Sequence, residues 1–151
     1  MNIEFFSIDR VDEISGTLTL LVWLRTMWTN ELLAWNPANH SGIDHVIANR
    51  NLFWQPDLVL YNSAVQPWDQ HVHTTKTWVY PDGESWDSTP ASLTFECRYE
   101  FDTFPFDVQN CSMRFASWNY VESQLDMQAR PLYVCTHSSR HLYVYVASNN
   151  T

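Results

Sequence analysis

Two cysteines, Cys97 and Cys111, enclose thirteen residues, and this segment constrains the fold more than any other part of the chain. A disulfide across a loop of about 15 residues would remove roughly 3 kcal/mol of unfolded-state entropy in the chain-entropy model. Near the middle, residues 104–107 read Phe-Pro-Phe-Asp. An aromatic residue before Pro105 favours a tight turn, one that can be cis, with the two rings packed on either side.

The composition predicts one folded domain over residues 1–151. Hydrophobic residues make up 45% and aromatic residues 15%, with eight Trp, which is too aromatic for a disordered chain. A domain of this length buries about two thirds of its unfolded surface. The chain has no run of about 18 apolar residues, so we predict no transmembrane helix. The longest apolar stretch, residues 18–24, is interrupted by Thr19 and suits a strand better.

The formal net charge of -9 argues against a nucleic-acid partner, because phosphate binding needs a basic surface. An acidic exterior favours the approach of cations by electrostatic steering. It is equally explained as charge that keeps an extracellular domain soluble. The chain contains no Gly-x-Ser-x-Gly, His-Glu-x-x-His or phosphate-loop motif, so we expect neither an enzyme nor a cofactor.

Three N-glycosylation sequons begin at Asn39, Asn110 and Asn149. Three sequons together with a cysteine-bounded loop predict a secretory route and an extracellular location. The first residues show neither the basic segment nor the apolar core of a signal peptide.

Alternating hydrophobic residues and turn signals predict an all-β fold. Residues 3–9 and 15–28 are expected strands, joined by a polar turn at 12–16. Residues 37–49 are polar and loop-like, and residues 80–83, Tyr-Pro-Asp-Gly, are a hairpin turn. The other expected strands are residues 70–80, a segment beginning near Ser85, residues 92–101 after a proline break at 90–91, and residues 142–147.

His71 and His73 lie two apart on one expected strand, a spacing that could hold a metal ion. No third ligand can be identified from the sequence. We therefore predict no metal site, and two exposed histidines on a strand are the alternative explanation.

A second motif, Trp54-x-Pro56-Asp57, precedes the run Leu-Val-Leu-Tyr-Asn. Pro56 ends one extended segment, and the Asp57 carboxylate can accept backbone N–H groups at the bend. We interpret Trp54 and Asp57 as structural. With the cysteine loop, this motif resembles the Cys-loop receptors, the pentameric ligand-gated ion channels, and especially their nicotinic members. The resemblance is strong over residues 3–128 and weak over 129–151.

The resemblance implies an immunoglobulin-like β-sandwich, a Cys97–Cys111 disulfide and a homo- or hetero-pentamer with ligand pockets between neighbouring subunits. Without a membrane segment, the chain is similar in kind to the soluble acetylcholine-binding proteins. The ligand would be a small acetylcholine-like amine held in an aromatic cage. An ammonium over a Trp face contributes about 0.5–2 kcal/mol.

Each face of the implied pocket has its own candidates. Trp23 and Trp35 are expected core residues instead. The principal-face candidates are Tyr61, Trp118, Tyr133 and Tyr143. The complementary-face candidates are Trp28, Trp78, Trp86 and Ser88.

The chain departs from the family pattern after Gln128, where a strand and a long loop are shortened. The N-terminal helix of the family is also absent. Nicotinic principal subunits carry adjacent cysteines in the capping hairpin, but this chain reads Cys135-Thr136. With the other two cysteines paired, Cys135 is a free thiol, an intermolecular disulfide or a buried small hydrophobe.

Two other functions fit parts of the sequence. A structural or assembly homologue would keep the pentameric fold and lose ligand binding with the capping region. A carbohydrate-binding module would explain the many Trp residues but neither motif. Ligand binding requires the rings of Tyr61 and Trp118 to line an open space, whereas assembly alone would leave them packed.

Overall fold

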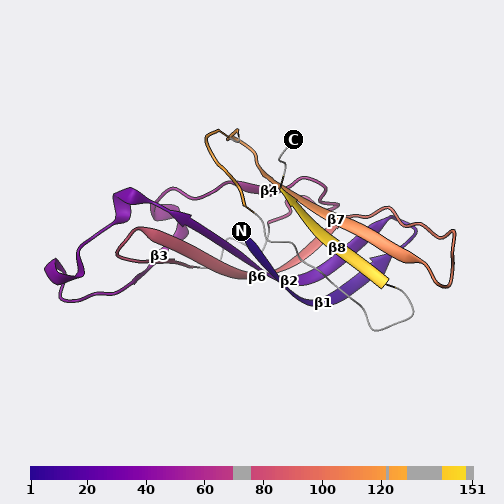
Figure 1. Cartoon of the computed structure of the whole chain (residues 1–151), viewed down its shortest axis with the longest axis horizontal. Coiled ribbons are helices and arrows are strands. Elements are labelled where there is room, and N and C mark those ends of the chain that lie inside the picture. The colour runs from indigo at the N-terminus through magenta and orange to yellow at the C-terminus, as the bar shows by residue number, and fades with distance from the viewer. Residues whose placement is uncertain (70–75, 122, 129–140, 149–151) are drawn as a thin grey trace.

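The computed structural model describes residues 1–69, 76–121 and 123–128, and the backbone of residues 141–148. These residues form eight strands in two sheets, ordered β1-β2-β6-β5-β3 and β4-β7-β8, which confirms the all-β sandwich (Figure 1). The five-stranded sheet comprises β1 (Asn2–Asp12), β2 (Thr17–Thr29), β3 (Val46–Asn49), β5 (Lys76–Val79) and β6 (Glu84–Glu96). The three-stranded sheet comprises β4 (Leu58–Leu60), β7 (Val108–Ser117) and β8 (His141–Ser148). Three 3-10 helices, η1 (Glu31–Leu33), η2 (Pro37–Asn39) and η3 (Arg50–Leu52), lie in the connections.

The β2–β6 pair is the longest among the described strands. Its thirteen antiparallel residue pairs run from Thr17↔Glu96 to Thr29↔Glu84 without a register shift. Alternation along β2 buries Leu18, Leu20, Val22 and Leu24, which are at most 3% exposed. The odd-numbered residues of β2 consequently face away from the second sheet.

The hydrophobic core lies between the two sheets. Phe95 of β6 and Phe115 of β7 are both fully buried and belong to one cluster with the leucines of β2. The Cys97–Cys111 disulfide is part of this cluster, with a Cα–Cα distance of 5.1 Å, which confirms the pairing that the resemblance implied. The disulfide therefore joins the end of β6 to β7 across the core.

The cysteine loop and the hairpin turn are observed as turns. The Phe104–Pro105 peptide bond is cis, and the rings of Phe104 and Phe106 remain 61% and 79% exposed instead of packing fully around the proline. In the hairpin, the Tyr80 N–H donates to the Glu84 carbonyl at 2.8 Å, and Gly83 has a φ of +82°. Glycine adopts this left-handed conformation without steric cost.

The expected break at residues 90–91 is wrong, because β6 continues through Pro90. Pro90 lies opposite Trp23 of β2, and in the described part of the chain β5 pairs with β6 only at Ser85 and Trp86. The other side of Pro90 has no described strand beside it, so its missing N–H costs no ladder hydrogen bond there.

The remaining expectations on the fold have mixed outcomes. Asn39 and Asn110 have exposed side chains, as glycosylation requires, and Asn149 lies outside the described residues. His71, His73 and Cys135 also lie outside them. Among the described helices, none is long and apolar enough to cross a membrane.

Candidate ligand-binding site

Two aromatic rings from the principal-face candidates lie together beside the β4–β7 pair of the three-stranded sheet. Tyr61 directly follows β4 and Trp118 directly follows β7. Because these strands are antiparallel, the two residues leave opposite ends of the pair, and their side chains converge beside it. Their ring centroids are 6.2 Å apart with an interplanar angle of 36°. Tyr61 is 50% exposed and Trp118 is 69% exposed. The two rings are therefore open to solvent, as ligand binding requires.

Tyr61 is positioned by the amide of the next residue. The Asn62 side chain donates to the carbonyl of Glu96 (3.2 Å) and to the carbonyl of Ser112 (2.7 Å), and it accepts the N–H of Arg114 (3.0 Å). Asn62 is only 6% exposed. It thus ties the end of β6 to β7, and the Tyr61 ring projects from a fixed backbone.

Trp118 is positioned by Asp57. One carboxylate oxygen of Asp57 accepts the hydroxyl of Ser117 (2.5 Å), and the other accepts the backbone N–H (2.7 Å) and side-chain amide (2.8 Å) of Asn119. The Asp57 carbonyl also accepts the Trp118 N–H at 3.4 Å. The sequence motif predicted that Asp57 accepts N–H groups at its own bend. The structure shows a longer-range role, because Asp57 holds the segment on both sides of Trp118.

These hydrogen bonds also set the charge state of Asp57. Burial by itself would raise the pKa of this carboxyl, but the hydrogen bonds from Ser117 and Asn119 outweigh burial and lower the pKa below the ordinary value of 3.8. Asp57 is therefore a carboxylate at neutral pH, the form that accepts all three side-chain and backbone donors.

The other two principal-face candidates cannot be placed beside this pair. Tyr133 lies outside the described residues. The backbone of Tyr143 lies in β8 opposite Asn110 of β7. Their proposed roles stay predictions.

Three complementary-face candidates lie together on the outer face of the five-stranded sheet. Trp78 and Trp86 are directly paired across β5 and β6, with stacked rings whose centroids are 5.8 Å apart. The ring of His45 also stacks on Trp78, with centroids 4.9 Å apart. Ser88 follows Trp86 at the next position on the same face of β6.

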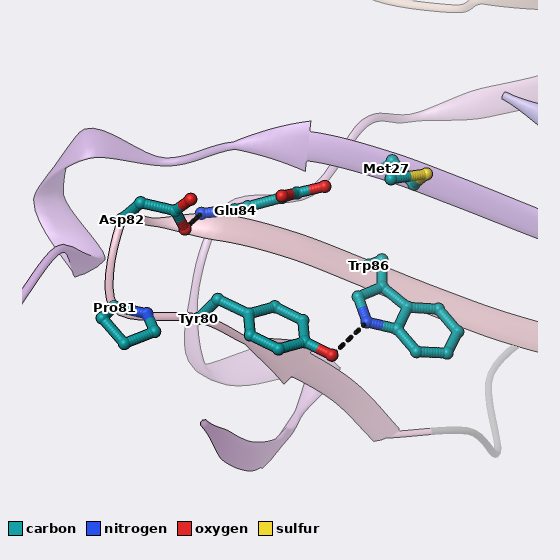
Figure 2. Close-up of a pocket in the computed structure, with 6 residues that line it drawn as sticks. All are labelled: Met27, Tyr80, Pro81, Asp82, Glu84 and Trp86. Atoms are coloured by element: carbon teal, nitrogen blue, oxygen red, sulfur yellow. Dashed lines mark hydrogen bonds between the residues drawn. The ribbon is translucent and has the colours of Figure 1, made fainter. Parts of the chain in front are cut away.

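A cavity of about 500 Å³ adjoins this aromatic row. Figure 2 shows Tyr80 and Trp86 beside each other, with the indole N–H of Trp86 donating to the Tyr80 hydroxyl at 3.3 Å. The carboxylates of Asp82 and Glu84 line the same cavity. Aromatic faces next to acidic side chains are suited to a cation.

Trp28 does not share this face. It lies opposite Ser85, which is fully buried, so its side chain points between the sheets. Its indole nitrogen is buried and has no hydrogen-bond partner within the described part of the chain. Trp28 lines a cavity with Trp54 and Met127. The structure therefore separates Trp28 from the other three complementary-face candidates.

Trp23 occupies the outer face instead, contrary to the expectation that it is a core residue. Trp23 lies opposite Pro90, and Arg25 and Met27 follow on the same face, opposite Ser88 and Trp86. Its ring contacts that of Phe6, with centroids 5.8 Å apart. The apolar residues at 21 and 23 obscured the alternation, but counting from the buried positions 18, 20, 22 and 24 would have predicted an outward Trp23.

Trp35 also lies outside the main core cluster. Its side chain is partly buried, and its indole N–H donates to the Ile43 carbonyl at 3.2 Å. Trp35 therefore fixes the loop that follows η1, and does not fill the space between the sheets.

Metal binding finds no support in the described residues, where no group of three or more His, Cys, Asp or Glu side chains could hold an ion. The histidine pair of the sequence analysis lies outside those residues, so its prediction stays untested.

The family model for the neurotransmitter-gated ion-channel ligand binding domain matches residues 1–149. The chain is 36% identical over 118 residues to an acetylcholine receptor non-alpha chain of Onchocerca volvulus, covering 78% of this chain and 27% of that protein. It is 34% identical over 130 residues to the human neuronal acetylcholine receptor subunit alpha-10, covering 86% of this chain and 29% of that subunit. The match to the human subunit alpha-3 is 33% over 118 residues, covering 78% of this chain and 23% of that subunit. The chain thus matches less than a third of the length of these relatives.

Proposed function

Because the chain belongs to the neurotransmitter-gated ion-channel ligand binding domain family, we propose that it binds a small cationic amine, such as acetylcholine, at an aromatic site between neighbouring subunits of a pentamer. The observation that carries this proposal is the Tyr61–Trp118 pair, two adjacent rings that are half or more exposed. Two adjacent exposed rings offer an ammonium an aromatic face to bind.

The binding would be non-covalent. An ammonium over the Trp118 face gains about 0.5–2 kcal/mol, and more when water is excluded. The net charge of -9 attracts a cation to the surface before it reaches the rings. No proton transfer or covalent step is needed, which fits a binding domain better than an enzyme.

The two sets of candidates would belong to different sides of one pocket. Tyr61 and Trp118 lie on the three-stranded sheet, whereas Trp78, Trp86 and Ser88 lie on the outer face of the five-stranded sheet. No ring contact joins the two sets in the described residues. A second subunit would bring its outer face against the Tyr61–Trp118 pair, with Trp23 as a further complementary-face residue. Trp28 stays a candidate for that face. Tyr133 and Tyr143 stay candidates for the principal face.

The same proposal places the domain outside the cell, with glycans at Asn39, Asn110 and Asn149. The assembly homologue is the second candidate. The observation that favours it is the apolar surface of the five-stranded sheet, where Phe6 is 53% and Met27 is 59% exposed. Such a surface suits subunit contact whether or not a ligand lies within it.

Tryptophan fluorescence during titration with acetylcholine, nicotine and serotonin tests the proposal. We expect a saturable change in the wild type and a loss of affinity of up to about 30-fold in Trp118→Ala, from the cation–π contribution alone. Trp35→Phe is the matched control, because Trp35 lies on neither face of the proposed pocket. A folded pentamer, shown by light scattering, that responds to none of these amines would contradict ligand binding and support the assembly homologue.

A further inference from the structure

A buried ion pair lies between the two sheets, directly behind the complementary-face residues. Asp87 stands between Trp86 and Ser88 on β6 but points inward, and it is only 3% exposed. The Thr26 hydroxyl donates to one of its carboxylate oxygens at 2.5 Å. The Arg50 guanidinium lies 3.1 Å from the other oxygen, in an ionic contact that is not aligned as a hydrogen bond.

Arg50 is itself largely buried, with 18% of its side chain exposed. A buried charge is tolerated only when it is paired, so the alternative positions of Arg50 and Asp87 are few. The ion pair therefore fixes the beginning of η3 against the inner face of β6.

Arg50 also holds the segment that follows it through hydrogen bonds to Gln55. Its Nε–H donates to the Gln55 side-chain oxygen at 2.6 Å, and the Gln55 amide donates back to the Arg50 carbonyl. This closed ring of contacts holds residues 50–55 as one unit. Residues 56 and 57 come next, and the Asp57 carboxylate binds the residues on both sides of Trp118.

One cavity of about 480 Å³ connects the parts of this network. Its lining includes the ion pair of Arg50 and Asp87, together with Gln55, Asp57 and Trp118. The link from Arg50 to Trp118 therefore runs along the hydrogen bonds of Gln55 and Asp57 and the short chain between these two residues.

We propose that Arg50 is a positioning residue for the amine site, and that its ion pair with Asp87 sets the place of Trp118 relative to the strand that carries Trp86 and Ser88. Arg50 touches no ligand. It acts through Gln55 and Asp57, and it links the principal-face loop of a subunit to the complementary-face strand of the same subunit. This inference rests on the proposed amine-binding function.

A variant that removes the network without leaving an unpaired charge tests this role. Arg50→Met alone leaves the buried Asp87 carboxylate without its ion-pair partner and is expected to destabilise the fold. In the triple variant Arg50→Met/Asp87→Leu/Thr26→Val, the ion pair and the hydroxyl bound to it are removed together, so none of these three positions keeps a buried charge or hydroxyl and stability should largely recover. Arg98→Met, at an exposed position of the cysteine loop, is the matched control.

Two measurements are made on each folded protein, which is labelled with 5-fluorotryptophan. The first is the acetylcholine affinity, and the second is the ¹⁹F resonance of Trp118, assigned through Trp118→Phe. We expect the triple variant to bind about tenfold more weakly, a change of 1.4 kcal/mol. We also expect its Trp118 resonance to shift while the control keeps the wild-type values.

A folded triple variant with the wild-type Trp118 resonance and wild-type affinity would overturn the inference, because the ion pair would then be structural only. Wild-type protein that binds no amine would instead refute the proposed function. In that case an unchanged Trp118 resonance in the triple variant would still refute the positioning role, and a shifted one would support it.

Discussion

The two candidate halves of the binding site are supported in different ways. Trp78, Trp86 and Trp23 stand on a sheet, where β2 and β6 pair over thirteen residues without a register shift. Trp118 stands beyond the end of β7, in a segment held by the Asp57 carboxylate. In the first half many backbone hydrogen bonds share the restraint, whereas in the second a single side chain provides most of it.

This difference predicts how each half responds to mutation. Loss of one side chain on the sheet leaves the backbone ladder in place, so neighbouring rings keep their positions. Loss of Asp57 removes every hydrogen bond that its carboxylate makes to residues 117 and 119, and the Trp118 backbone is then free to move. The principal face should therefore be the more fragile half.

The largest effect is expected from Asp57→Ala. Hydrogen bonds to a charged acceptor are worth about 1.5–3 kcal/mol each and are not additive, so we expect a total loss of about 3 kcal/mol of unfolding free energy. Urea unfolding measures it. Asp9→Ala, at an exposed position of β1, is the matched control and should change stability by less than about 0.5 kcal/mol. Equal stability of Asp57→Ala and wild type would show that the sheet, and not this carboxylate, holds the loop.

A smaller effect is expected from Gly83→Ala in the β5–β6 hairpin. A Cβ at Gly83 would lie 2.4 Å from the Asn30 carbonyl oxygen, and its φ of +82° adds backbone strain. We expect a loss of about 2 kcal/mol, measured by thermal unfolding.

Gly42→Ala separates the two causes of that loss. Gly42 also has a positive φ, +77°, but a Cβ there would meet nothing within 4 Å. It should cost only about 1 kcal/mol, the strain contribution alone. Identical losses in the two variants would mean that the Asn30 backbone yields and that the hairpin is less rigid than the sheet it extends.

The smallest effect is the pH dependence that Asp57 contributes. Its pKa is lower in the folded protein than the ordinary 3.8, so the unfolded chain binds this proton more tightly. The contribution of Asp57 is complete above about pH 4 and is lost as the pH falls through the folded pKa. Unfolding free energies between pH 6 and 3 should decline less steeply in Asp57→Asn than in the wild type. Parallel curves would place the acid sensitivity in other carboxyl groups.

The sequence predicted the sandwich well where local rules act alone. The hairpin at residues 80–83 and the strands near residues 3–9 and 15–28 each depend on a motif or an alternation that is complete within a few residues. The Cys97–Cys111 pairing was implied by the family resemblance. The proline break failed, because a proline ends a strand only if its missing N–H faces a partner. Whether a strand pairs with β6 at Pro90 depends on how far β5 extends, and the residues around Pro90 do not indicate this.

For the site, the sequence by itself determined which residue types are available: two motifs, a cluster of aromatic residues and an excess of acid. The tertiary structure decided which of them meet. Strand parity turned Trp23 outward and Trp28 inward, because successive side chains of a strand point to opposite faces. Pairing of β4 with β7 brought the rings of Tyr61 and Trp118 together across 56 intervening positions of sequence, since hydrogen bonds between strands do not depend on separation along the chain. The Arg50–Asp87 ion pair likewise joins residues far apart in sequence, and the residues around each of them do not predict the contact.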